Sequence, residues 1–370
     1  MKYYIIAGEA SGDLHASNLM KSIRQKDANA EFRFWGGDLM EKQGGELVKH
    51  YRDLAFMGFL EVVMNLRTIL GNLSYCKKDI VSWKPDVLVL VDYPGFNLRI
   101  AEFAHQKGMK VVYYISPQVW AWKRGRVKKI KKVVDKMLVI LPFEKEFYSG
   151  YGLDVDFVGH PLLDALQQEK HLSKEDFLKE NNLPTKPIIA LLPGSRKQEV
   201  TKMLKVMLQL VPVFKGYEFI IAGVPSLGKD FYQPFLNNKS VKVIFNQTHD
   251  ILYHADAALV TSGTATLETA LIGTPEVVCY KGSQLSYEIA KRVIKVKYIS
   301  LVNLIMDKLV VKELIQNDFT AENLKDELNL LLNDQLYRKQ QIADYDDLRE
   351  KLGKSGASEK AAGIILDFIS

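Results

Sequence analysis

The sequence predicts an α/β protein made of two doubly wound, Rossmann-like domains, each built on a parallel β-sheet. Short aliphatic runs alternate with helical patterns along the chain, which is typical of βαβ units. This series starts again after residue 160, and a length of 370 residues suits about two domains. Hydrophobic residues make up 47% of the chain and charged residues 25%, which excludes a disordered, collagen-like or coiled-coil protein.

The first half contains five predicted strands and three predicted helices. Each strand is a short run of apolar residues bounded by turn residues, and each helix has apolar residues at helical spacing. The strands are Tyr3–Ala7, Phe32–Trp35, Val87–Val91, Lys110–Ile115 and Met137–Ile140, and the helices are Ser17–Lys26, Phe59–Tyr75 and Leu98–Gln106.

The second half repeats the pattern after a segment, 161–187, whose three prolines predict a link between domains. We expect domains at 1–160 and 161–354, with a last helix at about 355–370 that packs back on the first domain. The expected strands are Ile188–Leu192, Glu218–Ala222, Val241–Phe245, Ala257–Val260 and Glu276–Cys279, and the expected helices are Glu199–Leu210 and Thr266–Ile272.

The charge and the cysteine content indicate which partners and which compartment to expect. The formal net charge is +6, which suggests an acidic partner such as phosphate, anionic lipid or nucleic acid. No apolar run approaches the roughly 18 residues that a membrane span needs, and the N-terminus does not resemble a signal peptide. Cys76 and Cys279 lack a CxxC spacing, so a zinc site is not expected. We therefore expect a protein of a reducing compartment, the cytoplasm.

Two loops of the first domain carry candidate catalytic groups, because ligands in doubly wound sheets bind beyond the carboxyl ends of the strands. The loop Gly8–Asp13 brackets small residues but lacks the GxGxxG pattern, and Glu9 favours sugar hydroxyls over phosphate. Asp92 directly follows the buried run Val87–Val91, where a general base belongs. The alternatives are a tight βα turn for the first loop and a helix cap for Asp92.

Two loops of the second domain are candidate anion sites. Gly194–Arg196 combines backbone amides, a hydroxyl and a guanidinium at a helix start, which suits a diphosphate without a metal. Ser262–Thr264 repeats this arrangement, and Glu268 follows one turn later, to accept ribose hydroxyls or to balance the helix dipole. These loops predict a nucleoside diphosphate ligand. Asp154–Asp156 precedes a strand instead of following one, so we interpret it as loop charge, not as a metal site.

Three features predict contacts with a surface. The segment Phe59–Leu73 is apolar on almost every face, and it is either buried on two sides, which the periodicity favours, or in contact with lipid. Trp120 and Trp122 share a loop after a strand, and indoles in loops usually face a ligand, a partner or a membrane. Lys123–Lys132 holds seven basic residues in ten, which fits a solvated helix, an anionic membrane, a phosphorylated substrate or nucleic acid.

Taken in order, these segments resemble the lipid-A-disaccharide synthases, a family of glycosyltransferases with the GT-B fold. The resemblance spans residues 3 to about 305. The matching blocks are AGEASGD (7–13), MGFLEV (57–62), the strand from Pro85-Asp86-Val87 with Asp92 and Phe96-Asn97, YYISPQVWAWKRGRVKKI (113–130), LPFEKEFY (141–148), FVGHPL (157–162), LLPGSR (191–196), TSGTATLE (261–268) and YISLVNLI (298–305).

The resemblance implies two domains facing across a cleft and a defined reaction. Enzymes of this family join UDP-2,3-diacylglucosamine to 2,3-diacylglucosamine 1-phosphate, giving a β-1,6-linked disaccharide and UDP with inversion, and the fold typically needs no metal or other cofactor. Asp92 is then the base, and Glu9 lies near the sugars. The residues expected to bind the UDP-sugar are Gly194, Ser195, Arg196, Ser262, Gly263, Thr264, Glu268 and Asn303.

Acylated substrates imply work at a membrane, so the resemblance raises the lipid interpretation of Phe59–Leu73 and assigns Trp120, Trp122 and Lys123–Lys132 to an anionic surface. We expect a cytoplasmic protein, peripheral on the inner membrane, with a homodimer as a possible assembly and no nucleic-acid partner. Many family members have an acidic residue where this chain has Gly95, which leaves Asp92 without a second carboxylate in its turn. The rival predictions are a UDP-N-acetylglucosamine 2-epimerase-like enzyme and a basic nucleic-acid-binding protein.

Overall fold

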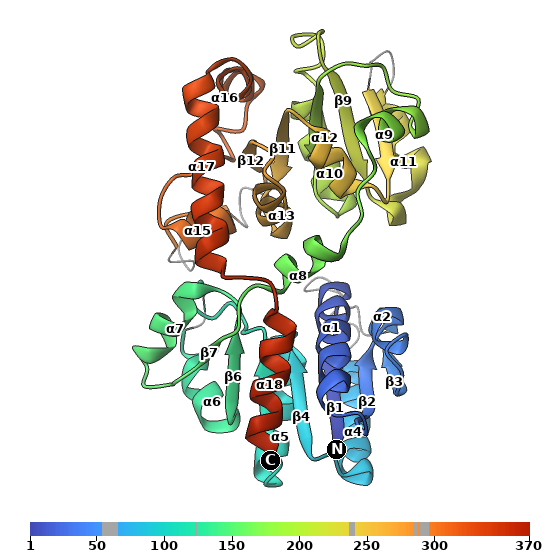
Figure 1. The fold of residues 1–370 in the computed structure, drawn as a ribbon, viewed down its shortest axis with the longest axis vertical. Helices are drawn as coiled ribbons and strands as arrows, with labels where there is room; N and C mark the ends of the chain where they lie inside the picture. The colour runs from blue at the N-terminus through green and yellow to red at the C-terminus, as the bar shows by residue number, and fades with distance from the viewer. Residues whose placement is uncertain (54–65, 123, 237–240, 284–286, 289–295) are drawn as a thin grey trace. The chain divides into compact units, whose positions relative to one another are not determined.

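A computed structural model of the protein describes residues 1–53, 66–122, 124–236, 241–283, 287–288 and 296–370. The chain forms two compact units (Figure 1), one of residues 1–164 with 352–370 and one of residues 165–351. Each unit is built on a parallel sheet with helices, which confirms the predicted fold class. The chain passes between the units after Asp164 and after Lys351, a few residues from the expected positions.

Within the described part of the first unit, the sheet has seven parallel strands in the order β3-β2-β1-β4-β5-β6-β7. The order reverses between β1 and β4, which makes their carboxyl ends the switch point of the sheet. Strands β3 and β7 were not among the predicted strands, because one is a half-exposed edge strand and the other has two residues. The strands are β1 Lys2–Ala7, β2 Glu31–Gly36, β3 Glu46–His50, β4 Val87–Val91, β5 Val111–Tyr114, β6 Lys136–Val139 and β7 Asp156–Phe157.

The helices of the first unit lie on both faces of this sheet. Helix α18 (Ala357–Ile369) comes from the C-terminal end of the chain and lies beside α1 (Ala10–Lys26). Helix α1 begins seven residues before the predicted start, because its first turn, Ala-Ser-Gly-Asp, has no apolar periodicity to reveal it. The others are α2 Asp38–Glu41, the 3-10 turn η1 Tyr51–Asp53, α4 Leu66–Trp83, α5 Pro94–Gln106, α6 Arg126–Val133 and α7 Pro142–Ser149. Helix α8, Pro161–Gln168, contains the passage from the first unit to the second.

The second unit holds six parallel strands among its described residues, in the order β10-β9-β8-β11-β12-β13. They are β8 Ile188–Leu192, β9 Glu218–Gly223, β10 Val241–Phe245, β11 Ala257–Thr261, β12 Glu276–Tyr280 and β13 Lys312–Ile315, the last not predicted. The helices are α9 Lys174–Glu180, α10 Lys197–Met207, η2 Pro225–Leu227, α11 Gly228–Leu236, α12 Thr248–His254, α13 Thr264–Ile272, α15 Leu301–Met306, α16 Ala321–Asn333 and α17 Gln335–Leu352.

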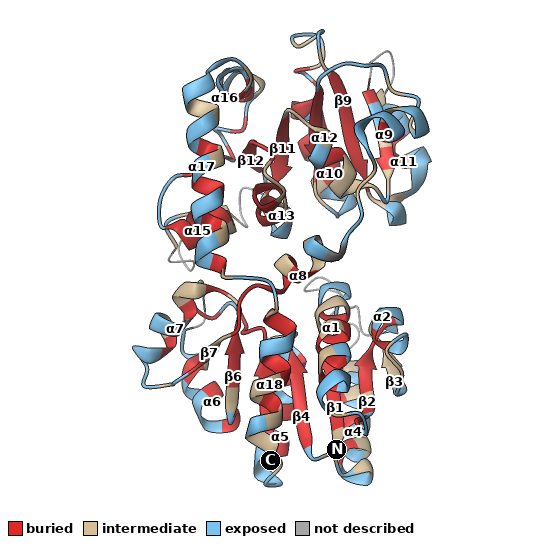
Figure 2. Cartoon of the chain, in the orientation of Figure 1, coloured by how far each residue is buried: buried red, intermediate tan, exposed pale blue. Residues whose placement is uncertain are grey.

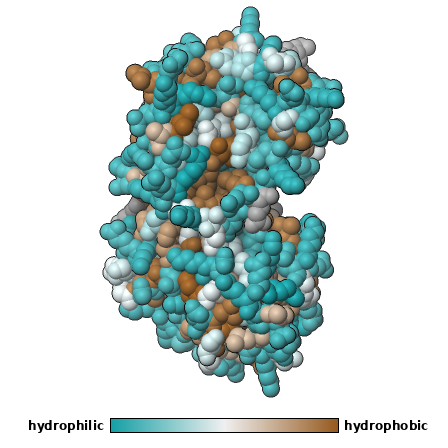
Figure 3. Space-filling model, viewed as in Figure 1, coloured by the Kyte–Doolittle hydropathy of each residue, from teal (hydrophilic) through white to brown (hydrophobic). Residues whose placement is uncertain are grey.

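The central strands are buried on both faces, as parallel sheets require. Every residue of β4 is buried: Leu88 and Leu90 pack into one core layer, and Val87, Val89 and Val91 pack into the opposite one. Figure 2 shows the buried strands between helices whose outer faces are exposed. In Figure 3 the visible surface of each unit is mainly hydrophilic, with smaller apolar patches. Burial of two apolar layers therefore fixes the strands, and with them the loops at their carboxyl ends.

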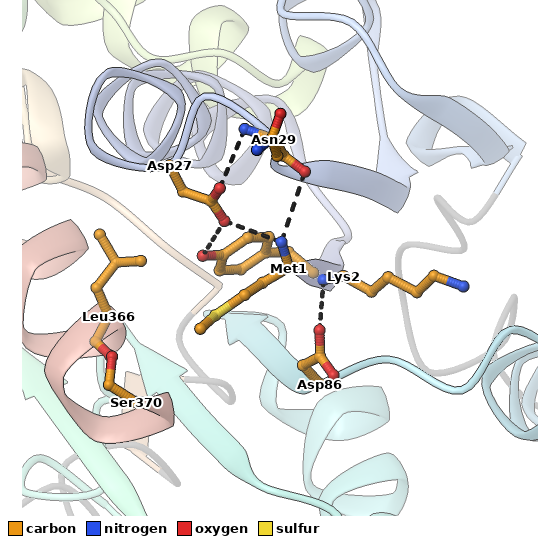
Figure 4. Close-up of polar contacts among 8 residues, drawn as sticks. Met1, Lys2, Asp27, Asn29, Asp86, Leu366 and Ser370 are labelled. Atoms are coloured by element: carbon orange, nitrogen blue, oxygen red, sulfur yellow. Dashed lines mark hydrogen bonds and ion pairs between the residues drawn. The ribbon is translucent and has the colours of Figure 1, made fainter.

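The amino end of β1 is tied to the loops around it (Figure 4). The Met1 ammonium and the Tyr3 hydroxyl both donate to Asp27 Oδ2, at 3.1 and 3.0 Å. The Lys2 N–H donates to Asp86 Oδ2 at 2.7 Å. The bonds to Asp27 tie β1 to the end of α1, and the bond to Asp86 holds β1 beside the start of β4, whose carboxyl end carries Asp92.

One carboxyl group in the core of the second unit has no polar partner among the described residues. Glu276, at the start of β12, is fully buried, and neither of its carboxyl oxygens accepts or donates a hydrogen bond there. Its backbone N–H donates to Gln341 on α17 at 2.9 Å. Burial raises the pKa of the Glu276 side chain well above the ordinary value of 4.5, so the folded protein keeps this group neutral.

The Glu276→Gln variant is expected to remove part of the pH dependence of stability. In the wild type the unfolded chain loses the proton at about the ordinary pKa while the folded chain keeps it. Stability is therefore complete below that pKa and falls by about 1.4 kcal/mol per pH unit above it, until the raised pKa is reached. Urea unfolding at pH 5 and pH 8 measures this, with Glu322→Gln, on the exposed face of α16, as control. If E276Q and the wild type lose the same stability between pH 5 and pH 8, this expectation is contradicted.

Candidate active site

Asp92 lies at the switch point of the first sheet, on a turn with unusual backbone angles. Residues Ala7 and Val91 are register partners, so the residues that follow β1 and β4 meet at one edge. Asp92 and Tyr93 have φ of +44° and +48°, both in the left-handed region. Such angles cost on the order of 1 kcal/mol or more each for residues with a side chain. The turn therefore needs support from its surroundings.

Two buried side chains hold the Asp92 turn. Asn97, on α5, donates from Nδ2 to the carbonyl oxygens of Asp92 at 2.8 Å and Val91 at 3.2 Å. The Tyr113 hydroxyl donates to the same Asp92 carbonyl at 2.5 Å. The helix-cap interpretation of this turn is thus replaced: Asn97 binds strand carbonyls from within α5, and the Asp92 side chain does not cap the helix.

The Gly8 position is required by the close approach of Tyr93. A Cβ atom on Gly8 would lie 2.3 Å from the Tyr93 ring. The same ring stacks on Phe96, with centroids 5.6 Å apart. The small residue after β1 therefore makes room for the turn after β4, which explains one glycine of the loop that the sequence analysis selected.

The Asp92 carboxyl group has the electrostatics of a general base. Burial, and then the negative charge of Glu9, raise its pKa to about 6, against a smaller opposite effect of the Tyr93 N–H. Glu9 is exposed and precedes α1, and its side chain makes no capping hydrogen bond there. The structure thus brings the two predicted catalytic carboxyl groups together from separate strands, with Asp92 ionised at neutral pH and close to its titration point.

Two nearby polar residues serve the fold. Asp13 is buried and accepts hydrogen bonds from the N–H groups of Gly37 and Met40 at 2.8 and 3.1 Å, which anchors the start of α2. His160 Nδ1 accepts a hydrogen bond from the Leu162 N–H at 3.3 Å, at the start of α8. Burial lowers the pKa of His160 to about 3, so this imidazole is neutral and is not a base at neutral pH.

In the second unit, the loop after β8 already holds a carboxylate. Glu199, on α10, accepts the Ser195 N–H at 3.1 Å. Gly194 has φ of +101°, and a Cβ there would lie 2.2 Å from the Glu199 carboxylate. Ser195 and Arg196 are exposed. The predicted anion loop therefore has the expected form, but Glu199, which the sequence analysis did not single out, occupies one of its amides.

The loop after β11 lies at the same sheet edge, because β8 and β11 are parallel neighbours. The Ser262 N–H donates to the Cys279 carbonyl at 2.9 Å, and its hydroxyl donates to the Ile299 carbonyl at 3.1 Å. Gly263 and Thr264 are exposed at the start of α13. The first-turn amides of a helix have no partner within it, so this position can receive an anion.

Asn303 is fully buried, and both ends of its amide are in use. Its Nδ2 donates to the Val311 carbonyl at 2.8 Å and to Glu313 Oε1 at 2.9 Å, and its Oδ1 accepts the Val311 N–H at 2.9 Å. Glu313 in turn accepts the N–H of Ile299, whose carbonyl holds Ser262. The geometry gives Asn303 a positioning role behind the Ser262 loop, and its contact with a sugar stays a prediction.

Glu268 lies one turn into α13, partly exposed, and has a neighbour that no motif revealed. His249 Nε2, on α12, is 3.6 Å from Glu268 Oε2. His249 and Glu268 belong to different helices, and a lone histidine in an amphipathic segment does not by itself indicate a functional site. Only the packing of α12 against α13 brings the two side chains together.

The two tryptophans differ in exposure. Trp122 is 42% exposed, as expected, whereas Trp120 is 7% exposed and packs edge-on against Phe143, with ring centroids 5.0 Å apart. The prediction that both indoles face a surface is therefore corrected, because the Trp120 ring completes the core beneath its loop. Trp122 remains the exposed indole of this pair.

The basic segment is an amphipathic helix along α6. Val127, Ile130 and Val133 are buried, and the lysines between them lie on the outer side. Lys123 lies outside the described residues. So does the first part of Phe59–Leu73, up to residue 65; in the remainder, Leu73 is buried and Leu70 is 52% exposed.

Over the part of the chain that the structure describes, no helix is long and apolar enough to cross a membrane. Across the same residues, no three His, Cys, Asp or Glu side chains gather in a way that could hold a metal ion.

The fold of the chain, with two units each built on a parallel sheet, is that of known GT-B proteins. UDP-GlcNAc 2-epimerase from Neisseria meningitidis, solved bound to UDP-GlcNAc, matches with a TM-score of 0.69 at 12% identity, over 99% of this chain and 100% of that one. The glycosyltransferase of kitacinnamycin matches with a TM-score of 0.66 at 13% identity, over 100% and 96%. At such low identity the likeness defines the fold class, GT-B, and no activity.

The sequence comparisons define the family. The family model described as lipid-A-disaccharide synthetase matches residues 3–367. Lipid-A-disaccharide synthase from Syntrophus aciditrophicus is 42% identical over 373 residues, 99% of this chain and 97% of that protein. The enzyme of the same name from Coxiella burnetii is 39% identical over 370 residues, 99% and 98%. The chain belongs to the lipid-A-disaccharide synthase family, and it is a glycosyltransferase with the GT-B fold.

The Gly8→Ala variant is expected to fold but to lose most of its transferase activity. The added methyl group pushes the Tyr93 ring away and shifts the Asp92 turn, and a shift of about 1 Å near a reacting group can cost 100-fold in rate. Gly95→Ala, in the same turn but with no atom within 4 Å of the new Cβ, is the matched control. Activity assays with circular dichroism measure this. Equal activity of the two variants contradicts it.

Proposed function

We propose that this enzyme transfers 2,3-diacylglucosamine from its UDP derivative to the 6-hydroxyl of 2,3-diacylglucosamine 1-phosphate, with inversion, giving the β-1,6-linked lipid A disaccharide and UDP. The observation that carries the proposal is the Asp92–Glu9 pair at the switch point of the first sheet. Family membership supports the substrate class. In this proposal the first unit binds the acceptor and the second binds the UDP-sugar.

Asp92 acts as the general base. Its carboxylate accepts the proton of the acceptor 6-hydroxyl, the hydroxyl oxygen forms the bond to the anomeric carbon, and the bond from that carbon to the diphosphate oxygen breaks. UDP leaves with the electron pair. A single base and direct displacement on the opposite face give inversion. Glu9 accepts a hydrogen bond from a hydroxyl of the bound sugar. By its charge it also keeps the pKa of Asp92 raised, which makes Asp92 a stronger proton acceptor.

The loops of the second unit bind the UDP part. Arg196 and the first-turn amides of α10 and α13 stabilise the negative charge that develops on the diphosphate, a role that needs no metal. Gly194, Ser195, Ser262, Gly263 and Thr264 shape these two loops. Glu268 accepts hydrogen bonds from the ribose hydroxyls, and Asn303 keeps the Ser262 loop in place. Transfer is accordingly expected to persist in EDTA.

Acylated substrates place the reaction at a membrane surface. We assign the exposed face of α6, together with Trp122 and the segment Phe59–Leu73, to contact with the anionic cytoplasmic face of the inner membrane. The fixed hydrophobic side of α6 supports this, because it orients the lysines outward on one face.

The reaction is tested by UDP release from UDP-2,3-diacylglucosamine in detergent, with and without the acceptor lipid. Wild-type enzyme is expected to release UDP only with acceptor, and its kcat/KM is expected to rise with pH through about 6 as Asp92 loses its proton. Asp92→Asn is expected to lower the rate by about 100-fold or more while UDP binding persists.

Each part of that test has its own contrary result. Asp92→Asn with wild-type rates contradicts the role of Asp92 as base. UDP release without acceptor favours chemistry of the 2-epimerase kind, and no release with both lipids present contradicts the substrates.

Reversing two exposed charges on α6 is expected to weaken membrane binding. Each lysine near an anionic surface contributes about 1 kcal/mol, so Lys128→Glu with Lys132→Glu is expected to lower vesicle binding at least about tenfold. Co-sedimentation with phosphatidylglycerol-containing vesicles measures it. The control is Lys325→Glu with Lys339→Glu, which makes the same change in net charge on exposed positions of the second unit. Equal losses in both pairs contradict a specific surface on α6.

A further inference from the structure

His249 lies between two carboxylates of the second unit. Its Nδ1 is hydrogen-bonded to Glu169, on the segment after α8, and its Nε2 is 3.6 Å from Glu268 Oε2 on α13. The exposed fractions of the side chains are 23% for His249, 26% for Glu268 and 45% for Glu169. Three separate elements thus meet at this imidazole, and all belong to the same unit.

The charges around His249 favour its protonated form. The ion pair with Glu268 has the largest effect and, with Glu169 and against partial burial, raises the pKa of His249 to about 9. On its own helix, the neighbouring Asp250 faces His171 instead, at 3.6 Å, and accepts the Leu172 N–H at 3.1 Å. The imidazolium therefore forms an ion pair with Glu268 on one side and is hydrogen-bonded to Glu169 on the other.

We propose that His249 is a positioning residue for the nucleoside diphosphate: its imidazole ring, fixed by Glu169, aims the Glu268 carboxylate at the ribose hydroxyls. This inference rests on the proposed role of Glu268. The 3.6 Å contact uses one oxygen of Glu268, which leaves the remaining acceptor sites of the carboxylate for vicinal hydroxyls. An ionised acceptor makes stronger hydrogen bonds than a neutral one, and a fixed carboxylate loses less freedom on binding.

A metal-binding role for this cluster is not supported. Over the residues that the structure describes, no group of three potential ligands has a geometry that could hold a metal ion. The ion pairs of His249 with Glu169 and Glu268 instead fit an imidazole that orients the carboxylate of Glu268.

The test compares the binding of UDP and of 2′-deoxyuridine diphosphate by isothermal titration calorimetry. The wild type is expected to prefer UDP, and Glu268→Gln is expected to reduce that preference. His249→Asn is expected to weaken UDP binding about tenfold and to reduce the same preference, since it removes a hydrogen bond to a charged group. His254→Asn is the matched control, because His254 lies on the same helix but bonds the Leu172 carbonyl.

The pH profile separates a charge effect from a merely structural one. Wild-type UDP affinity is expected to fall as the pH rises through about 9, when the imidazolium loses its proton. Glu169→Gln removes a carboxylate that favours the charged imidazole, so this fall is expected to move to lower pH. His249→Gln keeps a neutral donor and is expected to lack that part of the profile.

The outcomes are distinguishable. An unchanged ribose preference in folded His249→Asn, with Glu268→Gln affected, overturns the role of His249 and leaves the proposed function standing. A Glu268→Gln variant with wild-type preference overturns the ribose-binding role of Glu268 and, with it, the role of His249. If His249→Asn fails to fold, the Glu169→Gln profile decides: a shift to lower pH supports the inference, and an unshifted profile overturns it.

Discussion

The parallel pairing of β1 with β4 is the constraint on which the site depends. Both strands are buried on both faces, so their register is fixed by two apolar core layers. Their carboxyl ends consequently meet at one edge, where the strand order reverses. Glu9 and Asp92, far apart along the chain, become neighbours for this reason alone. The pKa of Asp92 follows from the same arrangement, because burial and the nearby charge of Glu9 both raise it.

A strained turn at this edge is held by ordinary polar bonds. The left-handed angles of Asp92 and Tyr93 are stabilised by Asn97 and Tyr113, which bind carbonyl oxygens of the turn and the strand. Gly8 contributes by lacking a side chain. Catalytic carboxyl groups are often presented on backbone of this kind, since a fixed turn orients the group without a large entropic cost at the moment of reaction.

In the second unit, three of the candidate ligand-binding residues, Ser195, Ser262 and Glu268, also have supporting neighbours. Glu199 fixes the Ser195 amide, the Asn303–Glu313 pair supports the segment that holds Ser262, and His249 faces Glu268. Glu313 and His249 come from elements separate from the residues that they support, whereas Glu199 lies in the first turn of the helix that follows the Ser195 loop. In the proposed function these contacts preorganise the surface that receives the UDP part, which reduces the cost of ordering side chains on binding.

The sequence by itself determined the fold class, most central strands and the family. Buried parallel strands are continuous aliphatic runs, and Val87–Val91 and Ile188–Leu192 were located to the residue for that reason. Short edge strands such as β3, β7 and β13 were missed, since few apolar residues are enough for an edge.

Only the tertiary structure decided what individual side chains do. Trp120 packs inward while Trp122 is exposed, although both stand in one loop. The Asn303 side-chain amide is hydrogen-bonded to the backbone of Val311, and His249 contacts Glu268 through the packing of two helices. Such outcomes depend on contacts between residues distant along the chain, and local sequence patterns carry no record of which side chain reaches which partner.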